Sequence, residues 1–326
     1  MNRLTYQDTE RLRGVFAGTV LLFITDRCPV QCAHCSVNSL PDSPTITDYA
    51  LFDEILAGIV ALAGTPVVAI SGGEPFSERP GLCRAVQALR DGGKDIVIFT
   101  SGYWAGGSRL QPWIARVLAQ TSTVFLSTDS FHQGRVARDR FRHAVRHVSE
   151  VGCRIVVQAL EEKETLGFAA EVLAEFYGSD WPCHADLVPI RPLRLGRGAG
   201  VFSIRSRHDL SAFGPCRLTK APTIRYDGTI IGCCNEALVL GDGPAALRRP
   251  VRSRADVVAV IEQYRSAALL RAVATVPLQR LAALPALRPL ADGRYDGICA
   301  ACWRAHDLID GDRATEAMLA ALTSHD

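Results

Sequence analysis

The chain has 326 residues, of which 48% are hydrophobic and 21% charged, and its formal net charge is +2. This length and composition allow a substantial buried core and predict one large domain with an appendage, or two domains. They exclude a membrane-spanning chain, since no stretch approaches the roughly 20 apolar residues that cross a bilayer. They also predict no nucleic-acid partner, since aromatic residues are only 7% and the arginines alternate with acidic residues.

The first two-thirds of the chain alternates short β-rich runs with helical stretches, a pattern typical of a parallel sheet covered by helices. Strands are predicted at residues 19–25, 67–71, 96–100, 124–128, 155–159 and 186–189. Helices are predicted near residues 49–63, 80–91, 112–119, 138–151 and 168–177. Most strands follow the previous one by about 30 residues, as strand–helix–strand units require. We therefore predict an α/β fold, an open curved sheet or partial barrel of six units, with its site at the carboxyl ends of the strands.

The alternation ends in a stretch rich in proline, glycine and arginine, which predicts a domain boundary. We expect a larger domain at residues 1–192 and a second domain at residues 193–326. Within the second domain the sequence predicts a hairpin over 223–233 with its turn at Asp227 and Gly228, a helix near 255–275 and a last helix near 313–322.

The first cysteines form a CxxxCxxC motif, Cys28, Cys32 and Cys35, directly after the first predicted strand. Without a signal peptide we expect a cytoplasmic protein, in which structural disulfides are rare and clustered cysteines indicate metal ligands or reactive thiols. Three thiolates in one short loop can hold three irons of a [4Fe–4S] cluster and leave the fourth iron open. The spacing alone leaves zinc and redox roles open, although His34 lies between two of the cysteines and is poorly placed as a fourth zinc ligand.

A second motif, Ser71-Gly72-Gly73-Glu74-Pro75, follows the second predicted strand. Alone, such a run is more often a tight turn. Together with the CxxxCxxC loop after the first strand, it resembles the GGEP motif of the radical S-adenosylmethionine (SAM) superfamily. The resemblance implies a partial (β/α)6 barrel in which the glycines let the backbone approach the amino group of SAM and Glu74 accepts its protons.

Further positions resemble the same family over most of the first domain. The resemblance implies that SAM is contacted by Ser101 after the third strand, and by Ser127 and Asp129 at the end of the fourth. A serine and an aspartate at these places can equally serve as turn or helix caps. Gln158 and the backbone around Leu187 are further analogues of the SAM contacts, although the fifth strand lacks the family's glycine.

The resemblance also implies the chemistry. A reducing partner such as flavodoxin or ferredoxin supplies an electron, SAM is cleaved to methionine and a 5′-deoxyadenosyl radical, and the radical removes a hydrogen atom from an unactivated carbon. The cofactors supply this reaction, so the tasks of the protein are to fix the geometry and to exclude water.

Four cysteines of the second domain, Cys216, Cys233, Cys299 and Cys302, are spaced like those of the SPASM/twitch extension of radical SAM enzymes. The resemblance rests on a C-x-G-x-C pattern through Gly228, followed by a CxxC pair. No cysteine follows Cys302, which favours the shorter twitch form with one auxiliary [4Fe–4S] cluster. A structural zinc ion on the same four thiolates is the alternative.

Cys234 is adjacent to Cys233, and a single cluster needs only one of them. A free thiol beside the active site could return a hydrogen atom to a substrate radical, as in some radical SAM epimerases of peptides and of aminoglycosides. Alternatively, Cys234 packs as a small hydrophobic side chain.

The family resemblance implies an enzyme that acts on a natural-product precursor. The first hypothesis is a ribosomally made peptide that is crosslinked, oxidised or epimerised. The second is a dehydrogenase or epimerase of an aminoglycoside, aminocyclitol or other carbohydrate-like molecule, and the third is a non-catalytic iron–sulfur or zinc protein. About 18 residues precede the first predicted strand, and we expect these to be too few for a separate domain that binds a leader peptide.

Overall fold

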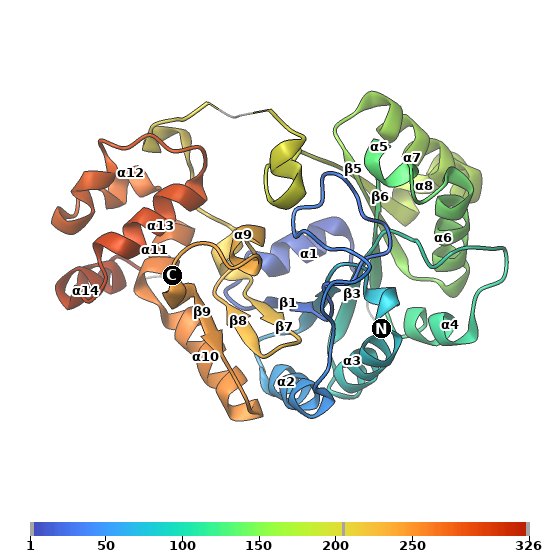
Figure 1. Ribbon diagram of the computed structural model, residues 1–326, viewed down its shortest axis with the longest axis horizontal. Coiled ribbons are helices and arrows are strands. Elements are labelled where there is room, and N and C mark those ends of the chain that lie inside the picture. Colours follow the sequence, from blue (N-terminus) through green and yellow to red (C-terminus); the bar gives the residue numbers. More distant parts are fainter. Residues whose placement is uncertain (1–2, 204–205, 324–326) are drawn as a thin grey trace.

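The computed structural model describes residues 3–203 and 206–323 (Figure 1). Within these residues one sheet of nine strands runs through the molecule in the order β6-β5-β4-β3-β2-β1-β7-β8-β9. The strands are β1 (Thr19–Phe23), β2 (Val67–Ser71), β3 (Asp95–Thr100), β4 (Thr123–Thr128), β5 (Arg154–Leu160), β6 (Ala185–Ile190), β7 (Thr223–Arg225), β8 (Thr229–Ile231) and β9 (Arg248–Pro250). All pairs from β6 to β7 are parallel, whereas β8 is antiparallel to both β7 and β9.

Helices follow most of the parallel strands, as predicted. The α-helices of the described residues are α1 (Tyr6–Arg13), α2 (Tyr49–Ala61), α3 (Arg79–Asp91), α4 (Pro112–Leu118), α5 (Ser130–Gln133), α6 (Arg138–Val151), α7 (Lys163–Tyr177), α8 (Trp181–His184), α9 (Glu236–Val239), α10 (Arg254–Ser266), α11 (Ala268–Thr275), α12 (Leu278–Leu281), α13 (Ile298–Leu308) and α14 (Arg313–Leu322). The prediction of an α/β fold with six strand–helix units is confirmed by β1 to β6 and their connecting helices. In the part of the chain that the structure describes, no helix has both the length and the apolar character that a bilayer crossing requires.

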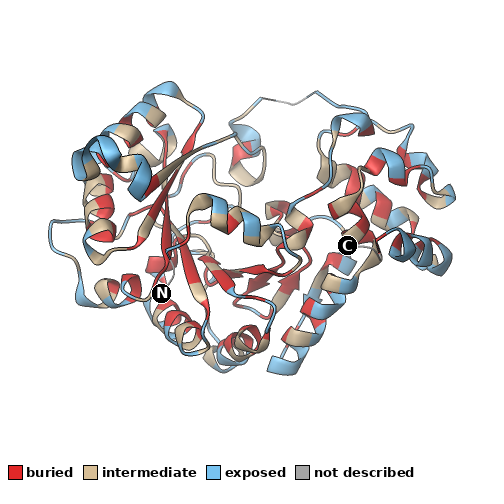
Figure 2. Cartoon of the chain, turned by 180° about the vertical axis from the view of Figure 1, so that it is seen from behind, coloured by how far each residue is buried: buried red, intermediate tan, exposed pale blue. Residues whose placement is uncertain are grey.

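The central strands are buried on both faces, which explains their nearly continuous runs of valine, isoleucine and leucine. Side chains such as Leu22, Ile70 and Ile98 belong to the large core on the helix-covered side of the sheet. The alternate residues of the central strands, such as Val97, Phe125 and Val156, form a smaller core on the inner face. Figure 2 shows this burial along the strands and on the helix faces that meet them.

The short helix α1, which the sequence pattern did not predict, covers the inner face near the amino ends of the strands. Its cap is a reciprocal pair, in which Thr5 and Asp8 each accept a hydrogen bond from the backbone of the other. The N–H of Tyr6 donates to Asp186, the second residue of β6, and the carbonyl oxygen of Leu4 accepts the hydroxyl of Thr123, the first residue of β4. These contacts close the amino end of the partial barrel.

The sheet continues across the predicted domain boundary, because β7 pairs in parallel with β1. The hairpin predicted over residues 223–233 is present as β7 and β8. The helix predicted near residues 255–275 is instead two helices, α10 and α11, with the break at Ala267. The helices from α11 onward pack around a second core of their own, which includes Leu281, Leu287 and Leu319.

Candidate active site and auxiliary cysteine site

The first three cysteines lie in the loop between β1 and α2, at the carboxyl ends of the parallel strands. Cys32 is buried, Cys28 and Cys35 are half-buried, and all three belong to one small apolar cluster with Val30 and Val136. Burial raises the pKa of Cys28 and of Cys32 to about 12. Without a metal, these two thiols are therefore neutral at physiological pH, and a bound metal would displace their protons. Three sulfur donors in a sheltered loop suit an iron–sulfur cluster, whose ligands are thiolates.

The Gly-Gly-Glu motif docks directly on this cysteine loop. The backbone N–H groups of Gly73 and Glu74 donate to the carbonyl oxygens of Thr25 and Arg27, at 2.7 and 2.8 Å. A Cβ atom on Gly73 would lie 2.3 Å from the Arg27 oxygen, and one on Gly72, whose φ is +153°, would lie 2.5 Å from the Thr25 oxygen. Any larger residue would push the two loops apart. The two glycines therefore hold the segment that carries the cysteines.

Glu74 is buried, with 1% of its surface exposed, and both of its oxygens have partners. Oε1 accepts from Thr100 Oγ1 at 2.7 Å and from the N–H of Phe76 at 3.3 Å, while Oε2 accepts from the N–H and the Oγ of Ser101 at 2.9 and 2.5 Å. Burial raises the pKa of Glu74, and the hydrogen bonds from Ser101 and Thr100 oppose the rise. A carboxylate offers about four lone-pair positions, so an ammonium group would have to share or displace one of these donors. Contact between Glu74 and the amino group of SAM stays a prediction.

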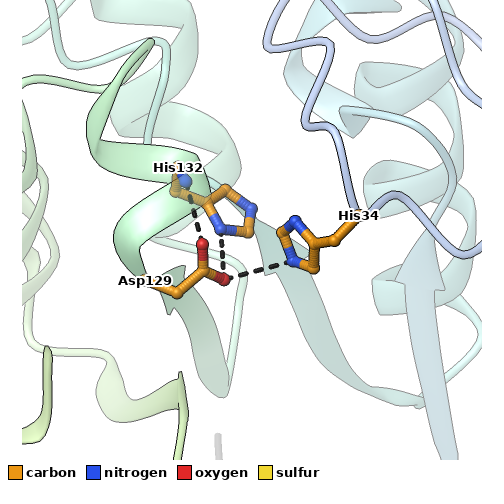
Figure 3. A group of neighbouring side chains, drawn as sticks. All are labelled: His34, Asp129 and His132. Atoms are coloured by element: carbon orange, nitrogen blue, oxygen red, sulfur yellow. Dashed lines mark hydrogen bonds and ion pairs between the residues drawn. The ribbon is translucent and has the colours of Figure 1, made fainter. Parts of the chain in front are cut away.

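Asp129 follows β4 and accepts hydrogen bonds from two histidines (Figure 3). Its Oδ2 lies 2.6 Å from His132 Nδ1 and 3.3 Å from His34 Nε2. Its Oδ1 accepts the backbone N–H groups of Phe131 and His132, at 2.9 and 2.8 Å, and so caps α5. Burial would raise the pKa of Asp129, but the hydrogen bonds from His132 and His34 hold it well below its usual range. The carboxylate therefore stays charged and orients both rings.

The ligand atoms of His34, Asp129 and His132 all lie within 4.8 Å of one another, a spacing at which such groups can also hold a metal ion. The short hydrogen bonds already account for the arrangement without an ion. His34 Nδ1, in contrast, is buried and has no hydrogen-bond partner among the described residues. This nitrogen belongs to the residue between Cys32 and Cys35, so a molecule bound at the cysteine loop could satisfy it.

Three of the side chains predicted to contact SAM lie near the carboxyl ends of their strands, and the strand register aligns two of them. Ser71 ends β2, and Ser127 on β4 pairs directly with Gln158 on β5. All three are partly exposed, and the two-residue repeat from Phe125 to Ser127 assigns them to the inner face of the sheet. The side chain of Leu187, in contrast, packs against the helix-facing core, so only its backbone remains available to a ligand.

The second set of cysteines also comes together in the structure. Cys216 precedes β7, Cys233 and Cys234 follow β8, and Cys299 and Cys302 lie one turn apart on α13. Burial raises the pKa of Cys233, and the proximity of Cys234, Cys299 and Cys302 raises it further. Burial likewise raises the pKa of Cys299 to about 12, with Cys216 the next contribution. Buried sulfur donors gathered from three segments suit the four-thiolate ligand set that the sequence predicts, for an iron–sulfur cluster or for zinc.

The two cysteine sites lie at opposite ends of β1. Thr223 of β7 pairs with Leu21 in parallel and with Ile231 of β8 in antiparallel, so β8 runs back toward the amino end of β1. Cys233 follows β8 at that end, whereas Cys28 follows the carboxyl end of β1. A strand of this length spans roughly 17 Å.

Cys234 lies at the amino end as well. Its Sγ is 3.6 Å from Arg13 Nη2, at the end of α1, and 3.8 Å from the carbonyl oxygen of Leu218. Since α1 covers the inner face near the amino ends, Cys234 is not brought to the cysteine loop, to Glu74 or to Asp129. This position argues against the hypothesis that Cys234 returns a hydrogen atom to a substrate at the carboxyl ends.

Three residues of these sites were not predicted. His132 follows Asp129 by three residues, so an aspartate cap with a histidine in the first turn was a local signal that could have found it. Arg13 contacts Cys234 across 221 residues of sequence, and Asn235 contacts Cys299 across 64. No local pattern reports contacts of that separation.

No model of a known protein family matches the chain. YydG of Bacillus subtilis (strain 168), whose name assigns it provisionally to peptide biosynthesis, is 23% identical over 135 residues. The alignment covers 40% of this chain and 41% of YydG, so the chain matches less than half of that relative's length.

The chain is also similar to solved structures. It matches Streptococcus suis SuiB bound to the precursor peptide SuiA with a TM-score of 0.50 and 14% identity, over 79% of this chain and 67% of SuiB. It matches anSMEcpe bound to AdoMet and the Cp18Cys peptide with a TM-score of 0.53 and 11% identity, over 94% of this chain and 99% of that one. At these identities the likeness establishes a common fold.

Proposed function

We propose that this chain is a radical SAM enzyme that abstracts a hydrogen atom from a ribosomally made peptide. The observation that carries the proposal is the docking of the Gly-Gly-Glu motif on the loop of Cys28, Cys32 and Cys35, at the carboxyl ends of β1 and β2. The loop supplies three thiolates. The motif binds this loop through backbone hydrogen bonds, at a distance that leaves no room for a side chain on Gly72 or Gly73. A tight turn elsewhere in a protein would have no such partner.

A [4Fe–4S] cluster on these thiolates and SAM, when bound, supply the electron transfer and the carbon radical of the reaction. The residues of the chain would bind and orient SAM. We assign Ser71, Ser127 and Gln158 to this task, because they present polar groups on the inner face of the sheet at its carboxyl end. We also assign His34, whose Nδ1 is buried without a partner among the described residues and whose ring Asp129 orients.

The peptide substrate is supported by the relatives. SuiB holds a precursor peptide, anSMEcpe holds a peptide together with AdoMet, and both have the fold of this chain. The name of YydG also refers to peptide biosynthesis. These are properties of the relatives, and the proposal extends them to this chain.

We further propose that Cys216, Cys233, Cys299 and Cys302 hold an auxiliary [4Fe–4S] cluster and that the reaction is an oxidation. A substrate radical can end by losing an electron and a proton, or by taking a hydrogen atom from a thiol. Hydrogen-atom transfer requires contact, and Cys234 lies beyond α1 at the other end of β1. An electron can cross the intervening protein. Abstraction of one hydrogen atom followed by loss of an electron and a proton gives a product two hydrogens lighter, either unsaturated or crosslinked.

The test uses anaerobically reconstituted, dithionite-reduced protein with SAM. We expect about eight irons per chain, slow release of 5′-deoxyadenosine, and faster release with a peptide encoded beside the gene. Replacing Cys28, Cys32 and Cys35 together by alanine should remove about half of the iron and abolish 5′-deoxyadenosine.

Three outcomes would contradict parts of the proposal. Iron without any 5′-deoxyadenosine would indicate a non-catalytic iron–sulfur protein. Zinc at the second site would show that these four cysteines hold no auxiliary [4Fe–4S] cluster. Faster release of 5′-deoxyadenosine with an aminocyclitol or aminoglycoside, and no response to any peptide, would show that the substrate is carbohydrate-like rather than a peptide.

A further inference from the structure

One buried asparagine donates hydrogen bonds to two of the auxiliary cysteines. Asn235 follows Cys234 and has 5% of its surface exposed. Its backbone N–H donates to the thiol of Cys233, which partly opposes the rise in pKa that burial gives this thiol. Its side-chain Nδ2 lies 3.2 Å from the Sγ of Cys299. The residue therefore connects the segment after β8 with the first turn of α13.

The orientation of the Asn235 side chain is determined by the helix that it caps. Its Oδ1 accepts the backbone N–H groups of Ala237 and Leu238, in the first turn of α9, at 3.0 and 3.3 Å. Only the amide oxygen can accept these two hydrogen bonds, because the amide nitrogen is a donor. The nitrogen must therefore face Cys299, and the assignment of the two amide atoms follows from chemistry.

We propose that Asn235 is a positioning residue that sets the reduction potential of the auxiliary cluster through Cys299 and Cys233. The inference rests on the proposed function, which assigns an auxiliary cluster to these thiols. Reduction adds negative charge to a cluster and its sulfur ligands, and N–H donors to those sulfurs stabilise the added charge. Two donors from one buried residue raise the potential, and a higher potential makes the cluster a better acceptor for the electron of a substrate radical.

The experiment uses the Cys28, Cys32 and Cys35 to alanine variant as its background, so that only the auxiliary cluster contributes a signal. Asn235→Asp and Asn235→Ser both keep an oxygen that can cap α9, and both keep the backbone N–H. Both lose the amide N–H donor to Cys299. Aspartate has no donor and adds a negative charge, and serine keeps only a shorter hydroxyl. A redox titration followed by electron paramagnetic resonance should give a lower potential in both variants, with the larger decrease in Asn235→Asp.

A cap on another helix provides the matched control. Asp312 Oδ1 accepts the N–H groups of Ala314 and Thr315 at 3.1 and 3.2 Å, the same arrangement at the start of α14. Asp312→Ala should lower the melting temperature and leave the potential unchanged, since Asp312 makes no hydrogen bond to sulfur in the described structure. This separates loss of a cap from loss of a sulfur contact.

The measured reduction potential of the auxiliary cluster tests the proposal. A wild-type potential in Asn235→Asp, with iron retained, overturns the role of Asn235 and leaves the auxiliary cluster in place. Loss of iron from both variants, with the helix content unchanged by circular dichroism, also overturns it, because Asn235 would then be needed for assembly rather than for tuning. If the background variant binds no iron, the chain has no auxiliary cluster. That result would overturn both this inference and the part of the proposed function that assigns the cluster.

Discussion

The guanidinium of Arg225 forms a two-pronged ion pair with Asp26, in which Nη1 lies 3.2 Å from Oδ1 and Nη2 lies 2.8 Å from Oδ2. Arg225 is the last residue of β7, whereas Asp26 precedes Cys28 by two residues in the cysteine loop. Arg225 is buried and Asp26 is half-buried, and the hydroxyl of Tyr226 donates to Asp26 Oδ2 at 2.8 Å. The hairpin that leads to the auxiliary cysteines is thus tied to the loop of the first three.

Replacing Arg225 by methionine should be strongly destabilising. The variant keeps much of the side-chain volume but leaves the Asp26 carboxylate without its main partner. Removing one member of a fully buried ion pair costs about 3–5 kcal/mol, and this is the upper limit here because the Asp26 side chain is 21% exposed. Urea unfolding measures the change, and Tyr226→Phe, which removes one hydrogen bond to the same carboxylate, should cost about 1 kcal/mol. Equal effects of the two variants would mean that the ion pair contributes no more than the hydroxyl.

Replacing Glu74 by glutamine should disturb both the fold of the site and the binding of SAM. The amide substitutes a donor for one carboxylate oxygen, so either the Thr100 and Phe76 donors or the two Ser101 donors lose their acceptor. Leaving buried donors unpaired costs about 1–3 kcal/mol. We expect lower stability in urea and weaker SAM binding by equilibrium dialysis. Ser101→Ala is the comparison, since it removes one donor to Glu74 and the acceptor of the Tyr103 N–H but leaves the carboxylate in place. SAM affinity that is unchanged in Glu74→Gln would rule out a role of this carboxylate in binding.

Cys233 and Cys234 should respond differently to alanine. Cys233→Ala removes a ligand of the proposed auxiliary cluster, so about half of the iron should be lost. Cys234→Ala removes a thiol that contacts Arg13 and the Leu218 carbonyl, so the iron content should stay that of the wild type. Product should also form normally in Cys234→Ala, and its mass should fall by two hydrogens.

Either of two results would reverse these assignments. Iron loss from Cys234→Ala alone would make Cys234 the ligand. Epimerisation with Cys234 as the hydrogen-atom donor would be restored by a product of unchanged mass in ordinary water that gains one deuterium in deuterated water and that Cys234→Ala cannot form.

His306, on the helix that carries Cys299 and Cys302, should make stability depend on pH. Burial lowers the pKa of His306 to about 4, and Asp307 only partly opposes this. An unfolded histidine takes up a proton as the pH falls below about 6.5, whereas the folded one stays neutral until about pH 4. The folded protein therefore has its full stability above that range and loses stability as the pH falls from about 6.5 toward 4.

The measurement compares wild type with His306→Gln in urea at pH 7.0 and at pH 5.5. The variant has no proton to take up at this position, so its urea midpoint should fall less on acidification. All other titrating groups are shared and cancel in the comparison. Equal falls in the two proteins would show that His306 titrates normally in the folded state.

The six-strand core and the candidate motifs followed from the sequence because both are local properties. A strand buried on both faces requires a run of apolar residues, so the run that predicted residues 67–71 became β2 without change. The cysteine spacing was also informative, because Cys28, Cys32 and Cys35 share a single loop. The function of Asp129 as a helix cap was one of the two readings open at the level of sequence, and the structure has that cap.

Other features depended on which segments meet in three dimensions. The sequence pattern reports which face of an element is buried but not what buries it, so it missed α1 and the break between α10 and α11. Neither could it assign the auxiliary cysteines to an end of the sheet. That end is determined by two strand registers. The register of β7 with β1 is set by backbone hydrogen bonds between residues about 200 positions apart. The register of β8 with β7 is set by a hairpin turn. Adjacency of Cys234 to a predicted ligand suggested a place near the substrate, and only the tertiary structure positioned it beside Arg13, beyond the helix that closes the barrel.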